Sequence, residues 1–215
     1  FTSLASDVND WHDKAKVAYG NKDYKQGAKW FTQAAEKGHA KSQAWLGFMY
    51  KNGKGVTKDY KQTVKWYTKA AEQGLEFAQH NLAILYHNGL GVTKDYKQAI
   101  KWYTKGAEQG DVATQFALAF LYEYELGAYR QAAKWYIKAA EQGEKNAQHT
   151  LATMYYEGQG VTQNYKQAYI WYSVAVASGR NSAYVRDSTA KKLSPSVLIE
   201  AQEEAAKLYE RINNG

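Results

Sequence analysis

Ala78–Gly110 reads AQHNLAILYHNGLGVTKDYKQAIKWYTKGAEQG, and related segments recur through the 215-residue chain. One short element of this stretch, Tyr followed by Lys or Arg and then Gln, begins at Tyr24, Tyr60, Tyr96, Tyr129 and Tyr165. The intervals between these starts are 36, 36, 33 and 36 residues, so one copy is three residues short. The shortening falls in a loop, where Glu-Leu-Gly-Ala replaces the longer Gly-Leu-Gly-Val-Thr-Lys. A nearly constant period of about 36 residues is typical of repeat proteins built from stacked units.

Each copy has the pattern of two helices. The segment Tyr96–Ala107 places its apolar residues at helical spacing, which predicts an amphipathic helix. Asp95 is suited to cap the start of this helix, and the Gln three residues later completes a capping-box pattern. Gly110 is expected to end it. A second helix begins at Ala78 and is expected to end at Gly89.

Two kinds of residue at fixed positions of the repeat predict how the helices pack. Small residues follow the conserved-looking Leu of the second helix and allow a neighbouring helix to approach closely: Gly47, Ala83, Ala119 and Ala152. Tryptophans on the first helix are expected to fill the wider gaps: Trp30, Trp66, Trp102, Trp135 and Trp171. Stacked helix pairs bury apolar surface that one pair alone cannot bury. The sequence therefore predicts an all-α solenoid.

The pattern resembles the Sel1-like repeat, a relative of the tetratricopeptide repeat. The residues that carry the resemblance are A-x-x-x-L-(G/A)-x-x-Y-x-x-G-x-G-V-x-x-D-Y-x-x-A-x-x-W-Y-x-K-A-A-E-Q-G, nearly complete from Ala78 to Gly110, and the match spans Ala15 to Gly179. The resemblance implies a right-handed α/α superhelix of about five 36-residue helix-turn-helix repeats plus a C-terminal capping helix. It also implies that the Leu/Tyr helices line a concave side, while the Trp-Tyr helices lie more convex.

The repeat boundaries divide the chain into an N-terminal helical or capping region, 1–22, the repeats, 23–179, and C-terminal helices, 180–215. Ser182 begins a further short helical pattern, and Ser194 followed by Pro offers a cap for a last helix. That helix is expected at about 196–212, with one apolar face. The apolar face predicts a cap over the end of the solenoid, and a docking helix for a partner is the alternative.

Composition excludes several classes of protein. The chain has no cysteine, so disulfides, Cys-ligated zinc and thiol chemistry are excluded. A content of 45% hydrophobic residues with seven Trp and nineteen Tyr is enough apolar surface for a folded core. The 28 Lys and Arg outnumber the 21 Asp and Glu, which gives a formal charge of +7. No apolar run is long enough to predict a transmembrane helix.

The sequence contains no recognisable catalytic motif. The Gly-x-Gly segments recur once per repeat between helices, so we interpret them as loop geometry rather than phosphate-binding fingers. The glutamates at Glu72, Glu108 and Glu141 occupy one repeated position and do not form a catalytic pair. We therefore expect no enzyme activity and no cofactor. Some cysteine-rich Sel1-repeat proteins are described as binding or cleaving β-lactams, but this chain lacks their cysteines.

Three histidines, His80, His87 and His149, are expected on the groove side of the Leu/Tyr helices. Their separation along the repeats argues against a zinc site, so we interpret them as hydrogen-bonding groove residues. A row of basic residues on the Trp-Tyr helices has two interpretations, a solvated face or a surface that attracts anions, and we favour the first. The row comprises Lys25, Lys29, Lys61, Lys65, Lys69, Lys97, Lys101, Lys105, Arg130, Lys134, Lys138 and Lys166.

The residues that vary between copies of the Leu/Tyr helix are our candidate partner-binding groove. Aromatic residues among polar ones are typical of protein interfaces, although Phe116 and Phe120 could instead pack against an adjacent repeat. The candidates are Phe48, Lys51, Asn52, His80, Ile84, His87, Asn88, Phe116, Phe120, Glu123, Tyr124, His149, Thr153 and Tyr156.

The resemblance implies a non-catalytic scaffold that binds a protein or peptide partner in its concave groove. It further implies a bacterial envelope protein or an effector-immunity type protein, with a periplasmic or secreted location and a signal peptide ahead of Phe1. A cytoplasmic location stays open. The alternative functions are a cell-wall ligand-binding protein or enzyme of the β-lactam or peptidoglycan type and, less favoured, an electrostatic nucleic-acid binder.

Overall fold

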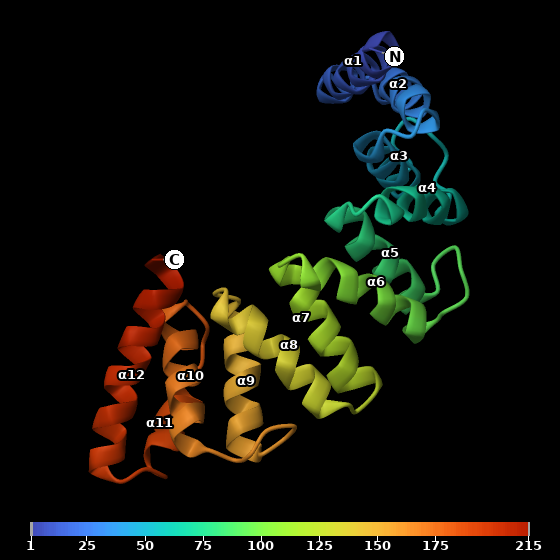
Figure 1. The fold of residues 1–215 in the computed structure, drawn as a ribbon. Helices are drawn as coiled ribbons and strands as arrows, with labels where there is room; N and C mark the ends of the chain where they lie inside the picture. Colours follow the sequence, from blue (N-terminus) through green and yellow to red (C-terminus); the bar gives the residue numbers. More distant parts are fainter. Residues whose placement is uncertain (1, 215) are drawn as a thin grey trace. The chain divides into compact units, whose positions relative to one another are not determined.

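The computed structural model describes residues 2–214, with side chains from Asp7 onward. Within this range the chain forms twelve α-helices and one short π-helix, and no strand (Figure 1). The elements are α1 (Thr2–Gly20), α2 (Tyr24–Glu36), α3 (Ala40–Asn52), α4 (Tyr60–Glu72), α5 (Glu76–Asn88), α6 (Tyr96–Glu108), α7 (Val112–Phe120), η1 (Leu121–Glu125), α8 (Tyr129–Glu141), α9 (Lys145–Glu157), α10 (Tyr165–Ala177), α11 (Ala183–Ala190) and α12 (Pro195–Asn214). The all-α prediction is confirmed, and the helix pairs begin and end at the glycines and caps that the repeat predicts.

The helices form two compact units, Phe1–Gln109 and Gly110–Gly215, called unit 1 and unit 2 below. In unit 1, each helix from α1 to α6 packs against the next one along the chain. The same holds in unit 2 from α7 to α11, where α10 also packs against α12. The division falls inside the repeat region 23–179, at a helix end where the sequence has no change of composition.

At the start of α6 the predicted Asp95 cap is confirmed, but the return hydrogen bond of a capping box, from the Asp95 N–H to the Gln98 side chain, is not formed. The Asp95 carboxylate accepts hydrogen bonds from the backbone N–H groups of Lys97 (2.9 Å) and Gln98 (3.0 Å). The N–H of Asp95 donates to the carbonyl of Tyr86 at 2.9 Å, not to the Gln98 side chain. This hydrogen bond joins the loop to the end of α5. In a capping box the Asp95 N–H would instead donate to the Gln98 side chain, and the Tyr86 carbonyl would lose this partner.

The second glycine of each Gly-x-Gly loop lies against the backbone of the preceding repeat. Gly91 has φ +73°, and a Cβ placed there would lie 2.4 Å from the carbonyl carbon and oxygen of Tyr60. Gly55 and Gly160 meet backbone in the same way, at 2.0 Å and 2.3 Å from carbonyl oxygens. Only glycine allows such a close approach with a left-handed backbone. The interpretation of these segments as loop geometry is confirmed.

The shortened loop before Tyr129 has a consequence that the sequence did not predict. The helix α7 passes into the π-helix η1, and the N–H of Ala128 then closes the loop by donating to the carbonyl of Tyr122 at 2.8 Å. A π-helix is wider than an α-helix and changes the direction of the side chains it carries. Glu123 and Tyr124, both candidate groove residues, lie on it.

Packing between repeats follows the predicted division into small and large residues. Gly47 lies under the ring of Tyr67, where a Cβ would come within 2.7 Å of the ring. Trp66 is only 5% exposed and packs with Leu46 and Ala35. Trp102, at the equivalent position, is also 5% exposed. Trp171 is 6% exposed, whereas Trp30 and Trp135 are partly buried, so three of the five predicted tryptophans are core residues of the repeat.

Glutamines form a second link between neighbouring repeats. The Gln79 amide donates to the carbonyl of Ala71 at 3.3 Å, and the Gln109 amide donates to the Gln79 oxygen at 2.7 Å. The corresponding pair Gln142 and Gln115 is joined at 2.8 Å in unit 2. The Gln of the recurring Glu-Gln-Gly segment therefore ties one repeat to the previous one, a role that helix-end patterns do not reveal.

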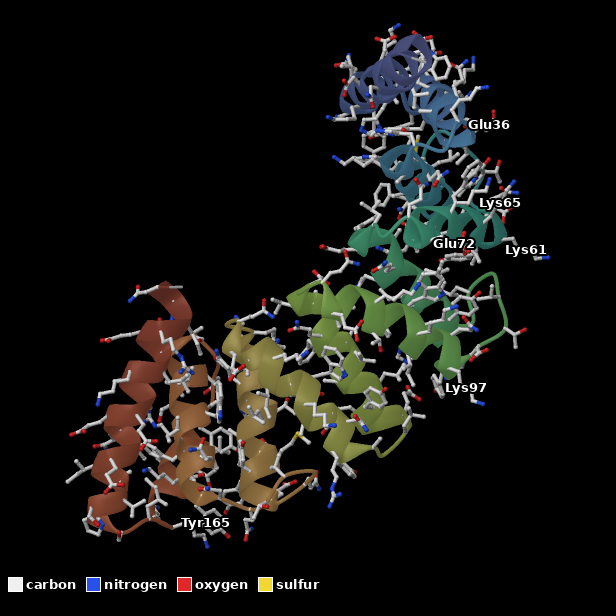
Figure 2. All side chains as sticks on the ribbon, in the orientation of Figure 1. Glu36, Lys61, Lys65, Glu72, Lys97 and Tyr165 are labelled. Atoms are coloured by element: carbon white, nitrogen blue, oxygen red, sulfur yellow. The ribbon has the colours of Figure 1, made fainter. Side chains whose placement is uncertain are left out.

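The predicted basic row lies on the outside of the helices, where it covers the tryptophans. Figure 2 shows Lys61, Lys65 and Lys97 projecting outward from α4 and α6. The ammonium groups of Lys101 and Lys105 lie 5.2 Å and 4.8 Å from the centre of the Trp102 ring. Each such cation–π contact is worth about 0.5–1 kcal/mol at an exposed site. Lys65 and Lys69 lie over Trp66 in the same way, and Lys138 lies over Trp135, so the row has a structural role in these three repeats.

The last helix covers one side of α10, as its apolar face predicts. Ala201 and Ala205 are buried against Tyr169 and Ile170. At the edge of this contact, Lys166 forms ion pairs with two glutamates of α12, at 3.1 Å and 2.7 Å. Lys166 therefore differs from the rest of the basic row. None of the helices described is long and apolar enough to cross a membrane.

Candidate functional site

The structure separates the predicted groove residues into two sets, one in each unit. In unit 1, Phe48, Lys51 and Asn52 lie on α3, and His80, Ile84, His87 and Asn88 lie on α5. In unit 2, Phe116 and Phe120 lie on α7, Glu123 and Tyr124 on η1, and His149, Thr153 and Tyr156 on α9.

Unit 1 has an apolar pocket of about 490 Å³ between α3 and the start of α5, called the Phe77 pocket. The Phe77 ring is 51% exposed and lies edge-on to Tyr67 at 6.1 Å between ring centres. Trp45 is stacked on Phe31 at 5.4 Å, which holds its ring in place. The residues that line the pocket are Lys41, Ala44, Trp45, Phe48, Leu75 and Phe77. Such a rigid aromatic pocket can accept an apolar side chain from a partner.

Of the seven groove candidates in unit 1, only Phe48 lines this pocket. The amides of Asn52 and Asn88 donate to carbonyls one turn back on their own helices, at 2.8 Å and 2.9 Å. The Lys51 ammonium donates to the Asn81 oxygen at 3.1 Å, and Ile84 is half-buried. The structure therefore does not gather the polar members of this set into one site.

The three predicted histidines do not converge. His80 packs edge-on to Tyr103 at 5.8 Å, and His87 packs edge-on to Tyr96 at 5.7 Å, both within unit 1. His149 lies in unit 2, where its Nδ1 is 2.8 Å from the Ser182 hydroxyl. Across the part of the chain that the structure describes, no three His, Cys, Asp or Glu side chains are grouped to hold a metal ion.

Unit 2 has a mixed polar and aromatic pocket of about 460 Å³ between η1, α8 and α9, called the Glu123 pocket. Four predicted residues meet here: Glu123, Tyr124, His149 and Thr153. The other lining residues are Tyr129, Thr150, Met154, Glu157 and Gln159. A second pocket of about 260 Å³ shares His149, Thr153 and Glu157 with it and is also lined by Tyr156, Tyr172, Tyr184, Val185, Ser188 and Thr189. The structure therefore brings five predicted residues into two adjoining pockets.

Hydrogen bonds orient the side chains of the Glu123 pocket. The Tyr136 hydroxyl donates to Glu123 at 2.7 Å. Burial is the main cause that raises the pKa of Tyr136, and the Glu123 carboxylate raises it further. The Thr153 hydroxyl donates to the carbonyl of His149 at 3.1 Å. Burial, and secondarily the charge of Arg180, lowers the pKa of His149, so this imidazole is neutral at pH 7.

The two phenylalanines of unit 2 have different roles. Phe116 is half-buried and packs against the core of unit 2, with its ring centre 5.6 Å from that of Tyr136. Phe120 is 41% exposed and lies 4.5 Å from Tyr124, between ring centres. The packing alternative is therefore right for Phe116 alone. Tyr156 packs edge-on to Tyr165 at 5.3 Å.

Sequence reasoning missed several of the lining residues, most clearly Trp45, Phe77 and Glu157. Phe77 occupies a helix position that is Lys41, Ala113 or Asn146 in other copies. A single large aromatic residue at a repeat position that is otherwise polar or small was the signal that could have identified Phe77. Glu157 occupies the repeat position of Asn52, Asn88 and Tyr124, which were candidates, so the same variation between copies was the signal that could have found it.

Two other histidines, His12 and His39, form a buried cluster in unit 1. Their Nδ1 atoms lie 2.9 Å and 2.8 Å from the same Ser42 hydroxyl, and their ring centres are 4.5 Å apart. Burial, with a further contribution from the nearby His39, lowers the pKa of His12 from 6.5 to about 4. Lys16 and Lys41 also lower it, whereas Asp13 raises it. The His12 side chain is only 9% exposed, so the folded protein favours its neutral form.

Unit 1 is therefore expected to lose stability in acid through His12. Because the pKa is lower in the folded state, the stabilisation is complete above pH 6.5 and is lost as the pH falls toward 4. Between pH 7 and 4.5 this contribution is about 2 kcal/mol. Urea unfolding of wild type and His12→Asn at both pH values measures it. If the free energy of unfolding of wild type falls between pH 7 and 4.5 by no more than that of His12→Asn, the assignment of this pH dependence to His12 is wrong.

Comparison with known proteins agrees with this architecture. The Sel1 repeat family model matches five segments, residues 18–39, 40–75, 77–111, 112–144 and 145–179. A Sel1 repeat protein from Oxalobacter formigenes has 29% sequence identity and a TM-score of 0.75, over 91% of this chain and 84% of that chain. A protective antigen of uropathogenic Escherichia coli with an SLR fold has 32% identity and a TM-score of 0.55, over 98% of this chain and 55% of that one.

A Sel1 repeat protein from Klebsiella pneumoniae has the same fold at 21% identity, with a TM-score of 0.51 over 88% of this chain and 96% of that chain. No curated protein matches the chain. The five family matches together cover most of the sequence: the first contains α2 and the end of α1, and the other four correspond to the helix pairs α3/α4, α5/α6, α7/α8 and α9/α10. The predicted resemblance is thus confirmed: the chain belongs to the Sel1 repeat family.

Proposed function

We propose that this protein is a non-catalytic scaffold that binds a protein partner, and that the Phe77 pocket is one of its anchoring points. Sel1 repeat proteins generally mediate protein–protein interaction. The single observation that supports the proposal most is the exposed aromatic surface of this pocket. Phe77 is half-exposed beside Trp45 and Phe48, and all three lie on the Leu/Tyr helices.

The aromatic surface is not required by the repeat itself. Other copies have small or polar residues where this copy has Phe77, and they fold as the same helix pair. Exposed apolar pockets are unfavourable in water and commonly mark interaction sites. Rigid aromatic anchors seated in pockets also carry a large share of the binding energy at protein interfaces.

The location proposed for the protein is the periplasm or the extracellular space, in an envelope or effector-immunity setting. The support for this is the resemblance of the repeats to those of exported bacterial proteins. Fractionation of the native organism, with the protein detected by antibody, tests it. Recovery only with cytoplasmic markers contradicts it.

Partner binding is expected to depend on Phe77. The test is affinity capture from lysate of the native organism with wild type, Phe77→Ser and the matched control Ile199→Ser, followed by affinity measurement for the retained protein. Ile199 is 58% exposed, belongs to α12 of unit 2 and does not line the Phe77 pocket. Phe77→Ser is expected to weaken binding about tenfold or more, because it removes an anchoring ring. The control is expected to change affinity by less than about twofold.

The comparison of the two variants decides between specific and general effects. Equal losses of affinity from Phe77→Ser and Ile199→Ser would indicate that any exposed apolar residue contributes to partner binding. Full affinity after Phe77→Ser would show that the partner does not use the Phe77 pocket. Either result contradicts the proposed anchoring role.

A further inference from the structure

The Glu123 pocket has a charge opposite to that of the whole chain. The protein carries a formal charge of +7, yet no Lys or Arg lines this pocket or the adjoining one. The Glu123 pocket contains two carboxylates, Glu123 and Glu157. Its histidine, His149, is kept neutral at pH 7 by burial. The ionisable lining of the pocket is therefore negative at neutral pH.

The backbone adds to this negative potential. Glu157 is the last residue of α9, so it lies where the carbonyls at the C-terminus of that helix carry partial negative charge. Glu123 is held by the hydroxyl of Tyr136 and has no basic neighbour among the residues that line the pocket. In the other copies the position of Glu123 is Lys51, His87 or Tyr156, so the carboxylate belongs to this copy only.

The repeat itself shows what the tyrosines of this pocket can bind. In two complete copies, a lysine two residues before the first tyrosine of the helix lies over that ring. Lys58 is 5.0 Å from the centre of Tyr60, and Lys94 is 4.6 Å from that of Tyr96. A cation over this tyrosine is thus an arrangement that the repeat forms within its own chain.

The shortened copy keeps the tyrosine and lacks the lysine. Gly127 stands two residues before Tyr129, where two complete copies have Lys58 and Lys94 and the copy at Tyr165 has Gln163. The Tyr129 ring is 39% exposed and lines the Glu123 pocket. Beside it, the π-helix η1 carries Tyr124, which is 64% exposed and lines the same pocket. The Tyr129 ring therefore lines a pocket with two carboxylates and has no lysine two residues before it, unlike Tyr60 and Tyr96.

We propose that the Glu123 pocket binds a cationic side chain, arginine or lysine, from a basic segment of the protein partner. The inference rests on the proposed scaffold function and adds the chemistry of the partner. Glu123 and Glu157 form charge-assisted hydrogen bonds with the cation, and the Tyr129 and Tyr124 rings cover its apolar stem and one face. The cation takes the place that Lys58 and Lys94 occupy over Tyr60 and Tyr96.

The test uses the full chain and three fluorescein-labelled peptides of equal length, built from Gly-Arg-Ser, Gly-Gln-Ser and Gly-Glu-Ser repeats. Fluorescence anisotropy at physiological salt measures their binding to wild type and variants. The pocket variant is Glu123→Gln/Glu157→Gln. The matched control is Glu141→Gln/Glu203→Gln, which makes the same change in net charge at two exposed glutamates that line neither pocket. Circular dichroism of each variant verifies its fold.

The Arg peptide is expected to bind wild type best, despite the positive charge of the chain. The pocket variant is expected to weaken this binding about tenfold or more, and the control less than about twofold. Tyr129→Leu keeps the apolar volume but removes the ring face, and is expected to weaken binding about threefold. This second variant changes no charge, so it separates the ring contact from general electrostatics.

Three results would overturn the inference: no binding of the Arg peptide, equal losses from pocket and control variants, or tighter binding of the Glu peptide. None of them bears on the Phe77 test, because that pocket lies in unit 1 and its readout is partner capture. If capture depends on Phe77 while the Arg peptide fails to bind, the scaffold function stands and the cationic inference fails.

Discussion

Replacing Trp102 with alanine is expected to lower the free energy of unfolding by about 3–5 kcal/mol. The side chain is only 5% exposed in the fold, so its removal exposes apolar surface and leaves a cavity. Trp66, at the same position one repeat earlier, shows the kind of contact involved, since it packs with Leu46 and Ala35. Midpoints of urea unfolding, followed by circular dichroism, measure the effect.

The control for this prediction is the neighbouring Lys101→Ala. Lys101 is exposed, and its ammonium lies 5.2 Å from the centre of the Trp102 ring. Its replacement is expected to cost about 0.5 kcal/mol, within the range of an exposed cation–π contact. Similar midpoints for the two variants would contradict the assignment of the tryptophan to the core and the lysine to the surface.

Gly91→Ala is expected to have the second largest effect, about 3 kcal/mol of lost stability. Two costs add at this residue. Its φ of +73° is unfavourable for alanine, and the new Cβ would lie 2.4 Å from the carbonyl of Tyr60. That neighbour is backbone at the start of α4, so it cannot move aside as a flexible side chain would.

Gly74→Ala separates the two costs, because it keeps the first and removes the second. Gly74 has φ +87°, but a Cβ there would meet nothing within 4 Å. The expected loss is about 1 kcal/mol, the backbone term alone. Chemical unfolding of the two variants under the same conditions makes the comparison. Equal losses for Gly91→Ala and Gly74→Ala would show that the contact with the preceding repeat contributes nothing.

The candidate site was only partly predictable from the sequence, and the reason differs between residues. Glu123, Tyr124, His149 and Thr153 were found because they vary at fixed positions of a repeat, and the structure places them together. Phe116 varies in the same way, yet it packs against Tyr136 in the core of unit 2. Variation between copies therefore identifies a position on the helix that differs from repeat to repeat. It does not show whether the side chain at that position lines a pocket or packs into the core of its own repeat.

Comparing the copies position by position does not show which side chains of different repeats combine into one pocket. The pocket around Phe77 joins side chains from two neighbouring repeats, and Trp45 contributes to it while also stacking on Phe31. The π-helix η1 lies directly before the loop that is shortened by three residues. Its effect on the direction of Glu123 depends on how α8 and α9 pack around it.

The sequence by itself determined the helices, their caps, the glycine turns and the family, because these features depend on residues a few positions apart and recur in several copies. The 3.6-residue period, the Asp95 cap and the left-handed glycines are local properties of the backbone. Only the tertiary structure decided which variable side chains share a pocket, because those side chains come from different helices. The distances between these side chains depend on how the helices pack, on the close approach at Gly91 and on the shortened loop before Tyr129. The sequence pattern of a single helix does not contain these distances.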